Sequence, residues 1–232
     1  MSDLVVAPVS SRATRYAVEH WHYSARMPVG RAQSYGVWET SRFVGVVLYG
    51  RGASPYLAPS LGLDRFEVCE LTRVALRDHD HAVSQIVART LALLRRSSPR
   101  LRVVVSFADP YHGHHGGIYQ ALNWLYLGLT EPAIAYRDGT GRLHHQRVVT
   151  ASGIVRQFGK VTRVPRPDDL ERVVLPGKHR YALPLDRALR RRLVADSLPY
   201  PPAVEVSEGT RLVTGEESQV RSLATAPPDR SH

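Results

Sequence analysis

The residues best suited to chemistry lie in one short segment, 106–120, which reads SFADPYHGHHGGIYQ. It follows a continuous apolar run and leads into a helical pattern, so we read it as strand end, loop and helix start. Ligands of open α/β sheets bind at such strand ends. Asp109 and three histidines offer acid–base groups there. Three glycines let backbone N–H groups approach an anion. The alternative is a plain turn begun by Asp109 and Pro110.

Histidines in this segment raise the question of a metal. His112, His114 and His115 lie close together, and with Asp109 they would suit iron or zinc. His79 and His81 flank the start of a neighbouring helix, but no HExxH or CxxC spacing is present. The spacing therefore predicts no defined metal site, although iron or zinc stays open.

Three further groups of polar residues have two readings each. Tyr23, after His22 at a helix exit, would donate to a developing charge or stack on a base, or else pack inward. Glu70, Thr72 and Arg73 interrupt an apolar strand, where they line a cleft or pair structurally. The segment 177–181, GKHRY, suits contact with phosphates and bases, or forms a solvated charged face.

The elements that must position these residues follow from periodicity. We expect a helix capped by Ser10 or Ser11 and ending near 22–24, and a β-hairpin of strands 34–39 and 42–50. A strand over 66–76 precedes a helix capped by Asp78 or Asp80, and a strand covered on both faces spans 101–109. A short helix and a strand follow at 118–129.

The last third of the chain is less regular. Asp138-Gly139 predicts the turn of a hairpin over 133–149, whereas the Pro-rich region 150–185 reads as irregular. A final helix at about 186–196 carries four arginines (187 and 190–192). We expect 1–202 to be one catalytic domain and 203–232 a disordered tail. The fold class is α/β, a mixed sheet with helices on both faces.

Charge and composition favour a nucleic-acid partner. The formal net charge is +10. Residues 203–232 hold five acids and three arginines, so residues 1–202 carry about +12, the electrostatic footprint of a nucleic-acid binder. The apolar stretches are too short to span a membrane, and no secretory signal is recognisable. One cysteine, Cys69, reads as buried and excludes an internal disulfide, which fits a reducing bacterial cytoplasm.

Taken together, these motifs resemble the Mom family, DNA-modification proteins best known from bacteriophage. The resemblance spans roughly 15–202, and GIYQALNWLYLG (117–128) is its most specific part. It implies a fold like that of Gcn5-related acyltransferases, whose element order the chain also matches. The implied activity converts the N6 amino group of adenine in duplex DNA to a carbamoylmethyl derivative, which protects phage DNA from restriction.

The resemblance also implies a set of site residues. The implied active site is His22, Tyr23, Ser106, Asp109 and Tyr119. The binding residues that we expect around it are Glu70, Thr72, Arg73, His114, Gly116, Gly117, Lys178, His179 and Arg180.

The group donor is a separate question. Acyl-CoA users of this fold usually carry a glycine-rich loop before the helix that follows the long strand. Here that stretch, 77–84, has no glycine and two aspartates that would repel a pyrophosphate. We therefore favour an activated glycine such as glycyl-tRNA, which makes tRNA a second expected partner. The alternatives are a CoA-dependent N-acetyltransferase acting on a protein or small amine, and a non-catalytic DNA-binding protein.

Overall fold

A seven-stranded mixed sheet forms the body of the protein in a computed structural model that describes residues 3–52, 54–150, 152–157 and 160–202. Its strand order is β1-β2-β3-β4-β5-β12-β6, and all neighbours are antiparallel except β4 and β5. The strands are β1 (Leu4–Pro8), β2 (Ala32–Glu39), β3 (Arg42–Gly50), β4 (Val68–Leu76), β5 (Val103–Ala108), β6 (Leu125–Leu129) and β12 (His179–Pro184).

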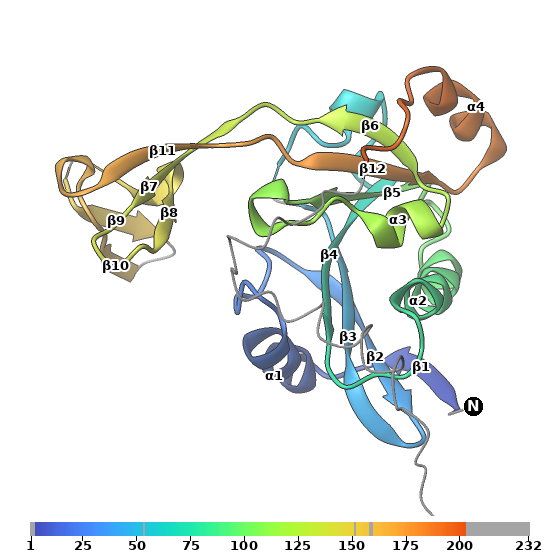
Figure 1. The fold of residues 1–232 in the computed structure, drawn as a ribbon. Helices are drawn as coiled ribbons and strands as arrows, with labels where there is room; N and C mark the ends of the chain where they lie inside the picture. The colour runs from blue at the N-terminus through green and yellow to red at the C-terminus, as the bar shows by residue number, and fades with distance from the viewer. Residues whose placement is uncertain (1–2, 53, 151, 158–159, 203–232) are drawn as a thin grey trace, which may run out of the picture.

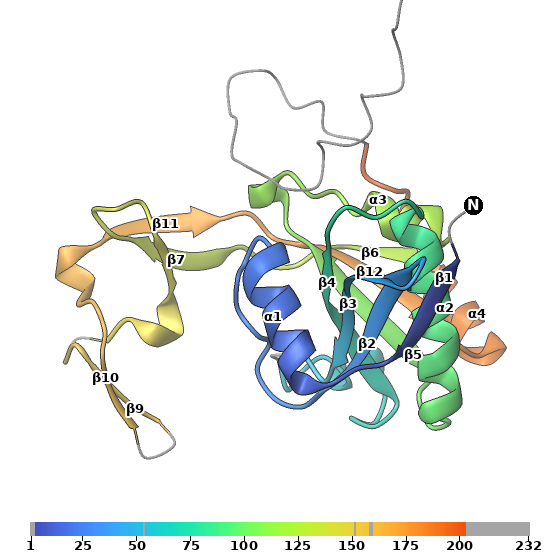
Figure 2. The same ribbon diagram turned by 90° about the horizontal axis from the view of Figure 1, so that it is seen from below.

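Helices cover both faces of this sheet, as predicted (Figures 1 and 2). The helices are α1 (Ser11–Trp21), α2 (Val83–Ser97), α3 (Gly117–Ala121) and α4 (Arg187–Ala195), with 3-10 turns η1 (Pro59–Leu61) and η2 (Pro110–His112). On one face α1 packs on Val46 and Leu48 of β3, and α4 packs on Val103 and Val105 of β5. The alternate residues point to the opposite face, where α2 covers them.

Local sequence explains most of these elements. Ser10 caps α1 by accepting a hydrogen bond from the Ala13 N–H. Thr40 and Ser41 both adopt positive φ angles in the two-residue turn between β2 and β3. Four consecutive buried residues begin β5, which confirms a strand covered on both faces. Cys69 is a free, partly buried thiol whose pKa burial raises to about 12.

The predicted cap of α2 is wrong. The helix begins at Val83 after Ala82, and neither Asp78 nor Asp80 caps it. The loop before it is instead held by the buried carboxylate of Glu39, which accepts hydrogen bonds from the backbone N–H groups of Asp80 and His81. Since Glu39 lies about forty residues away, short-range capping rules do not detect it.

The prediction that 150–185 is irregular is also wrong. This region contains β9 (Ile154–Gln157), β10 (Lys160–Arg163), η4 (Pro167–Asp169), β11 (Glu171–Leu175) and the central strand β12. The strand β1 was not predicted either. The expected disordered tail, 203–232, lies outside the described residues.

An arm, defined as residues 133–175, projects from the body between β6 and β12 (Figure 1). Its three-stranded sheet pairs β11, β7 (Ala133–Arg137) and β8 (Leu143–His145), and η3 (Gln146–Val148) and the β9–β10 hairpin complete it. The predicted turn at Asp138 is confirmed, because its carboxylate accepts hydrogen bonds from the Thr140 and Arg142 N–H groups. No described helix is long and apolar enough to cross a membrane.

Candidate active site

Two parallel strands part at the centre of the sheet. The pairing of β4 with β5 covers three residue pairs, from Val68–Val103 to Glu70–Val105, although both strands continue beyond it. The Ser106 hydroxyl lies 2.8 Å from the Leu71 carbonyl oxygen and thereby connects the diverging strands. Side chains on the diverging ends therefore border an opening in the sheet rather than a continuous hydrogen-bonded surface.

An ion pair stands at the end of β5. One oxygen of Asp109 accepts a hydrogen bond from the Tyr111 N–H, which starts the η2 turn. The other oxygen lies 2.8 Å from the Lys178 ammonium, at the start of β12. Asp109 is largely buried and Lys178 is half-exposed. The carboxylate is thus fixed in position by two partners.

Four rings gather beside this pair. Tyr23 is half-exposed and lies between the imidazoles of His22, His112 and His114, at centroid distances of 4.3, 4.9 and 5.4 Å. We call these residues the aromatic group. The exposed ring of Tyr23, flanked by partly buried imidazoles, offers a surface on which a planar base can stack.

His22 is held neutral in one tautomer. Burial, and after it the positive Arg73, lowers the pKa of His22 to about 3. Its Nδ1 lies 3.1 Å from the Ser24 backbone nitrogen. Because a backbone N–H can only donate, Nδ1 accepts, and the ring proton resides on Nε2. His22 therefore presents a neutral N–H donor rather than a base.

The strand β4 brings two charges to the same place. Burial raises the pKa of Glu70, which Arg73 and Lys178 partly oppose. Burial lowers the pKa of Arg73, which nevertheless donates to the Arg26 and Thr72 carbonyl oxygens. Thr72 is not part of the group, since its hydroxyl donates to the Leu48 carbonyl of β3.

A layer of buried tyrosines supports the loop from beneath. Tyr119 is 8% exposed, and its hydroxyl lies 2.8 Å from the Ser106 hydroxyl. Tyr181 of β12 donates to the His115 carbonyl at 2.5 Å. Gly116 has a φ of +88°, and a Cβ there would overlap the Tyr181 ring. Ser106 and Tyr119 are therefore placed as supporting residues under the loop.

The structure separates some predicted binding residues from this centre. His179 is 9% exposed, and its Nδ1 lies 2.9 Å from the hydroxyl of Tyr126 in β6. Gly117 opens α3, where a Cβ would lie 3.3 Å from His115 Nε2. The predicted residues that do converge are His22, Tyr23, Glu70, Arg73, Asp109, His114 and Lys178.

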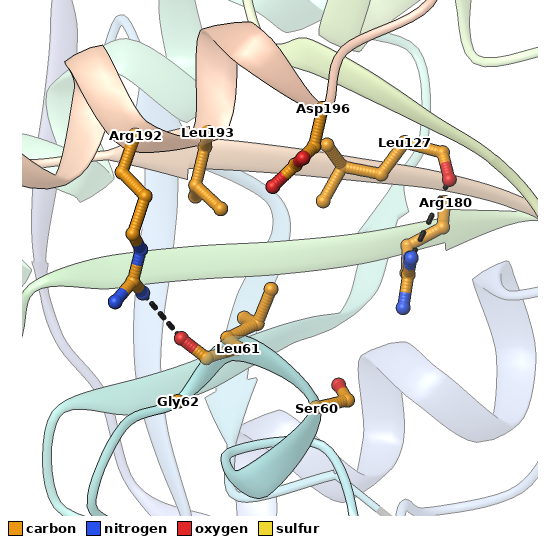
Figure 3. A pocket seen from close by; sticks show the side chains of 8 residues that line it. All are labelled: Ser60, Leu61, Gly62, Leu127, Arg180, Arg192, Leu193 and Asp196. Atoms are coloured by element: carbon orange, nitrogen blue, oxygen red, sulfur yellow. Dashed lines mark hydrogen bonds between the residues drawn. The ribbon is translucent and has the colours of Figure 1, made fainter.

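Arg180 enters a separate pocket under α4 (Figure 3). The pocket has a volume of about 360 Å³ and is lined by Ser60, Leu61, Gly62, Leu127, Arg180, Arg192, Leu193 and Asp196. Arg180 donates to the Leu127 carbonyl, while its buried Nε has no hydrogen-bond partner among the described residues. Arg192 donates to the Leu61 carbonyl from the other end. The two guanidinium groups make this pocket electropositive at its ends, although Asp196 lies between them.

The loop before α2 does not fit the pyrophosphate of CoA. Two of its backbone N–H groups, those of Asp80 and His81, already donate to Glu39 at 2.7 and 2.9 Å. The Glu39 carboxylate is 2% exposed, and an added anion would meet its charge at short range. As for a metal, no group of three or more His, Cys, Asp or Glu side chains within the described ranges could hold one.

Sequence reasoning missed the residues that act over long range. Glu39 holds the loop before α2, and Tyr181 holds the loop before α3. The sequence indicated Glu39 only as the end of a strand and Tyr181 only as part of the segment 177–181. Their partners lie more than forty residues away in the chain, and no spacing rule connects them. The pairing of Asp109 with Lys178 likewise depends on the register of β12, which the Pro-rich surroundings concealed.

Known proteins resemble this chain in sequence and, at low sequence identity, in structure. A model of the Mom protein family matches residues 3–202. A methylcarbamoylase of Escherichia phage Mu is 28% identical over 208 residues, covering 86% of this chain and 84% of the relative. An N-acetyltransferase of Staphylococcus aureus gives a TM-score of 0.44 at 10% identity, covering 80% of this chain and 100% of that one. A spermidine N-acetyltransferase of Vibrio cholerae gives 0.45 at 8%, covering 82% and 98%.

Proposed function

Because the chain belongs to the Mom protein family, we propose that it is a transferase that modifies adenine in duplex DNA. The transferred group is a carbamoylmethyl group on N6, and its role is to protect phage DNA from restriction. The observation that carries the proposal is the Asp109–Lys178 ion pair, which stands beside the aromatic group where β4 and β5 part. A largely buried carboxylate next to the exposed ring of Tyr23 suits proton transfer from a stacked base.

Each converging residue takes a role in this proposal. The adenine leaves the duplex, as bases must when enzymes modify them, and stacks on Tyr23 and the imidazoles of His112 and His114. Asp109 accepts the N6 proton, with Lys178 holding the carboxylate in place. The Nε2–H of His22 donates to the oxyanion that forms on the donor carbonyl. Glu70 and Arg73 bind the polar end of the donor. Tyr119 and Ser106 are positioning residues.

The donor in this proposal is glycine activated as glycyl-tRNA. An attack of N6 on the glycyl ester would give the amide N6–CO–CH₂–NH₂ and release the tRNA hydroxyl. The new amine then attacks C6 through a five-membered ring and expels the original nitrogen. The product, C6–NH–CH₂–CO–NH₂, is an isomer of the amide, so no further reactant is needed. The occupied loop at Glu39 favours this donor over acyl-CoA.

Nucleoside mass spectrometry of plasmid DNA tests the activity. DNA from cells that express the chain should contain carbamoylmethyl-adenosine. The Asp109→Asn variant should lower its level by a factor of about 10² to 10⁴, the usual contribution of acid–base catalysis. Arg15→Ala, in an exposed ion pair of α1, is the control and should behave as the parent. Unmodified adenosine from a soluble parent would refute the proposal.

The donor is tested separately with purified protein, unlabelled plasmid and ¹⁵N-glycine charged on tRNA. Fragmentation should locate the label on the nitrogen bonded to the purine ring. A label in the terminal amide would exclude the rearrangement, and no label would exclude glycyl-tRNA. Acetylated adenine formed with acetyl-CoA would instead support the CoA-dependent alternative.

A further inference from the structure

The arm is an insertion into what would otherwise be a β-hairpin. Strands β6 and β12 are antiparallel neighbours, and the arm connects them. Its two ends meet at Thr130 and Lys178, where the Thr130 N–H donates to the Lys178 carbonyl and the Lys178 N–H donates to the Thr130 hydroxyl, both at 2.9 Å. The hydrogen bonding between β6 and β12 therefore continues up to the base of the arm.

The arm contributes little to any hydrophobic core. Among its described side chains, Ala135 alone is buried. None of its described residues belongs to the hydrophobic clusters that α1, α2 and α4 form with the main sheet. The burial of apolar surface thus does not account for a segment of this length, and its outward-facing surface is the part that needs explaining.

That surface is positively charged. Residues 133–175 hold eight Lys and Arg and four Asp and Glu. Two of the acids are already engaged, Asp138 with His144 and Glu171 with Arg137. The exposed arginines without an ion pair among the described residues are Arg142, Arg163, Arg166 and Arg172. Arginine side chains of this kind match the bidentate geometry of phosphate groups.

The base of the arm lies at the candidate active site. The chain leaves β11 and reaches Lys178, the partner of Asp109, three residues later. At the other root, the Tyr111 hydroxyl of η2 and then Glu171 raise the pKa of Arg137 in β7, so η2 and the arm are in contact. The base of the arm therefore lies next to the Asp109–Lys178 pair, while the rest of the arm projects away from the body (Figure 1).

We propose that the arm is a clamp for duplex DNA, which grips the phosphate backbone next to the adenine at the active site. This inference rests on the proposed function, because duplex DNA is the substrate there. The charge of the arm matches the phosphates, and its projection from the body lets it contact DNA beyond the reach of the sheet (Figures 1 and 2). A second basic surface, the exposed arginines of α4 (187 and 190–192), is expected to contact phosphates as well.

The salt dependence of DNA binding tests the clamp. The variant Arg163→Gln, Arg166→Gln, Arg172→Gln should bind duplex DNA more weakly, with a log–log salt slope smaller by about 0.9 for each lost phosphate contact. Arg95→Gln, Arg96→Gln, at the exposed end of α2, is the matched control and should keep the parent's slope. Asp168→Asn, Asp169→Asn changes the charge of the arm in the opposite direction and should tighten binding.

Excision of the arm gives an independent measurement. Because Thr130 and Lys178 already meet, a short glycine-containing turn in place of 132–176 should preserve the cooperative thermal transition of the body while DNA affinity falls. If the arginine variant keeps the parent's salt slope for DNA binding, the clamp is overturned, even if the parent modifies adenine. The clamp is also overturned if the variant's salt slope falls for binding to tRNA and not for binding to duplex DNA. A parent that binds DNA through the arm yet leaves adenine unmodified would refute the proposed function alone.

Discussion

His22 acts in the proposed reaction as a donor, and this assignment differs from the base that a histidine at an active site first suggests. Its lowered pKa and its Nδ1 contact with the Ser24 N–H leave a proton on Nε2. The Gln side chain also ends in an N–H group at this reach. We therefore expect His22→Gln to retain more activity than His22→Ala, by about tenfold or more.

The same pair of variants separates the two roles by kinetics. A donor to the oxyanion acts in the transition state, so His22→Ala should lower kcat more than it raises KM. Its pH profile should also keep the parent's shape, because a group with a pKa of about 3 does not titrate near neutrality. Equal loss of activity in His22→Gln and His22→Ala, with a changed acid limb, would assign His22 as the base instead.

At the scale of single residues, the sequence predicted which residues lie near the site better than it predicted what each one does there. Asp109, His114 and Tyr23 converge as expected, because each follows directly from the end of a recognisable element. Ser106 and Tyr119 come from equally recognisable elements, yet the structure places them beneath the loop. Which side of a strand or short helix faces the opening depends on register, and register is set by partners far along the chain.

The loop between η2 and α3 depends on two glycines for different reasons. Both Gly113 and Gly116 have positive φ angles, of +76° and +88°, which cost an alanine about 1–2 kcal/mol. Only Gly116 also faces the Tyr181 ring, while Gly113 faces open space. Gly116→Ala should thus destabilise the protein by about 1–3 kcal/mol more than Gly113→Ala. Thermal unfolding measures both variants, and equal transition temperatures would contradict the packing argument.

The hydrogen bonds by which Glu39 holds the loop before α2 make the free energy of unfolding depend on pH. Burial raises the pKa of Glu39, but the N–H groups of Asp80 and His81 outweigh it and hold the pKa below its ordinary value. The stabilisation is therefore complete above the ordinary pKa of a glutamate, about 4.3, and is lost as the pH falls through the lowered one. Glu39→Gln should lose about 1.5–3 kcal/mol at pH 7.

Denaturant titrations at several pH values check this linkage. The difference between the parent and Glu39→Gln should shrink as the pH falls below about 4. Glu19→Gln, which removes an exposed partner of Arg15, serves as the control and should cost less than about 1 kcal/mol. A constant difference between the parent and Glu39→Gln across that range would show that the ionised carboxylate does not hold the loop.

Elements with their own local signals were predicted, and those made by long-range pairing were not. The β2–β3 hairpin, α2, β5 and α4 follow from turns, caps and periodicity. The strand β12 lies between β5 and β6 at the centre of the sheet, yet glycine and proline border it closely and its pattern is short. Its place is fixed by two neighbours that precede it by fifty residues or more.

At the scale of the whole molecule, β12 connects the two basic surfaces. The arm leads into its first residue and α4 follows its last, and in Figure 1 the arm and α4 lie at opposite ends of the body. Six strand residues span about 20 Å, and α4 then turns back under the sheet, because its Arg192 and Asp196 line one pocket with Arg180. The start of α4 thus lies about 20 Å from the base of the arm, and the arm projects away from that base (Figure 1).

This separation predicts how the two surfaces combine. The salt slope counts the phosphates that the protein contacts, so losses add when the arm and α4 touch one duplex. On a duplex of about 20 base pairs, the arm variant combined with Arg190→Gln, Arg191→Gln should lose the sum of the two separate reductions. On a duplex of about 6 base pairs, which is about 20 Å long and too short to reach both surfaces, the combined loss should not exceed the larger one. Additive losses on both duplexes would place the two surfaces close together on the DNA. Losses that never add would mean that the arm and α4 bind separate molecules.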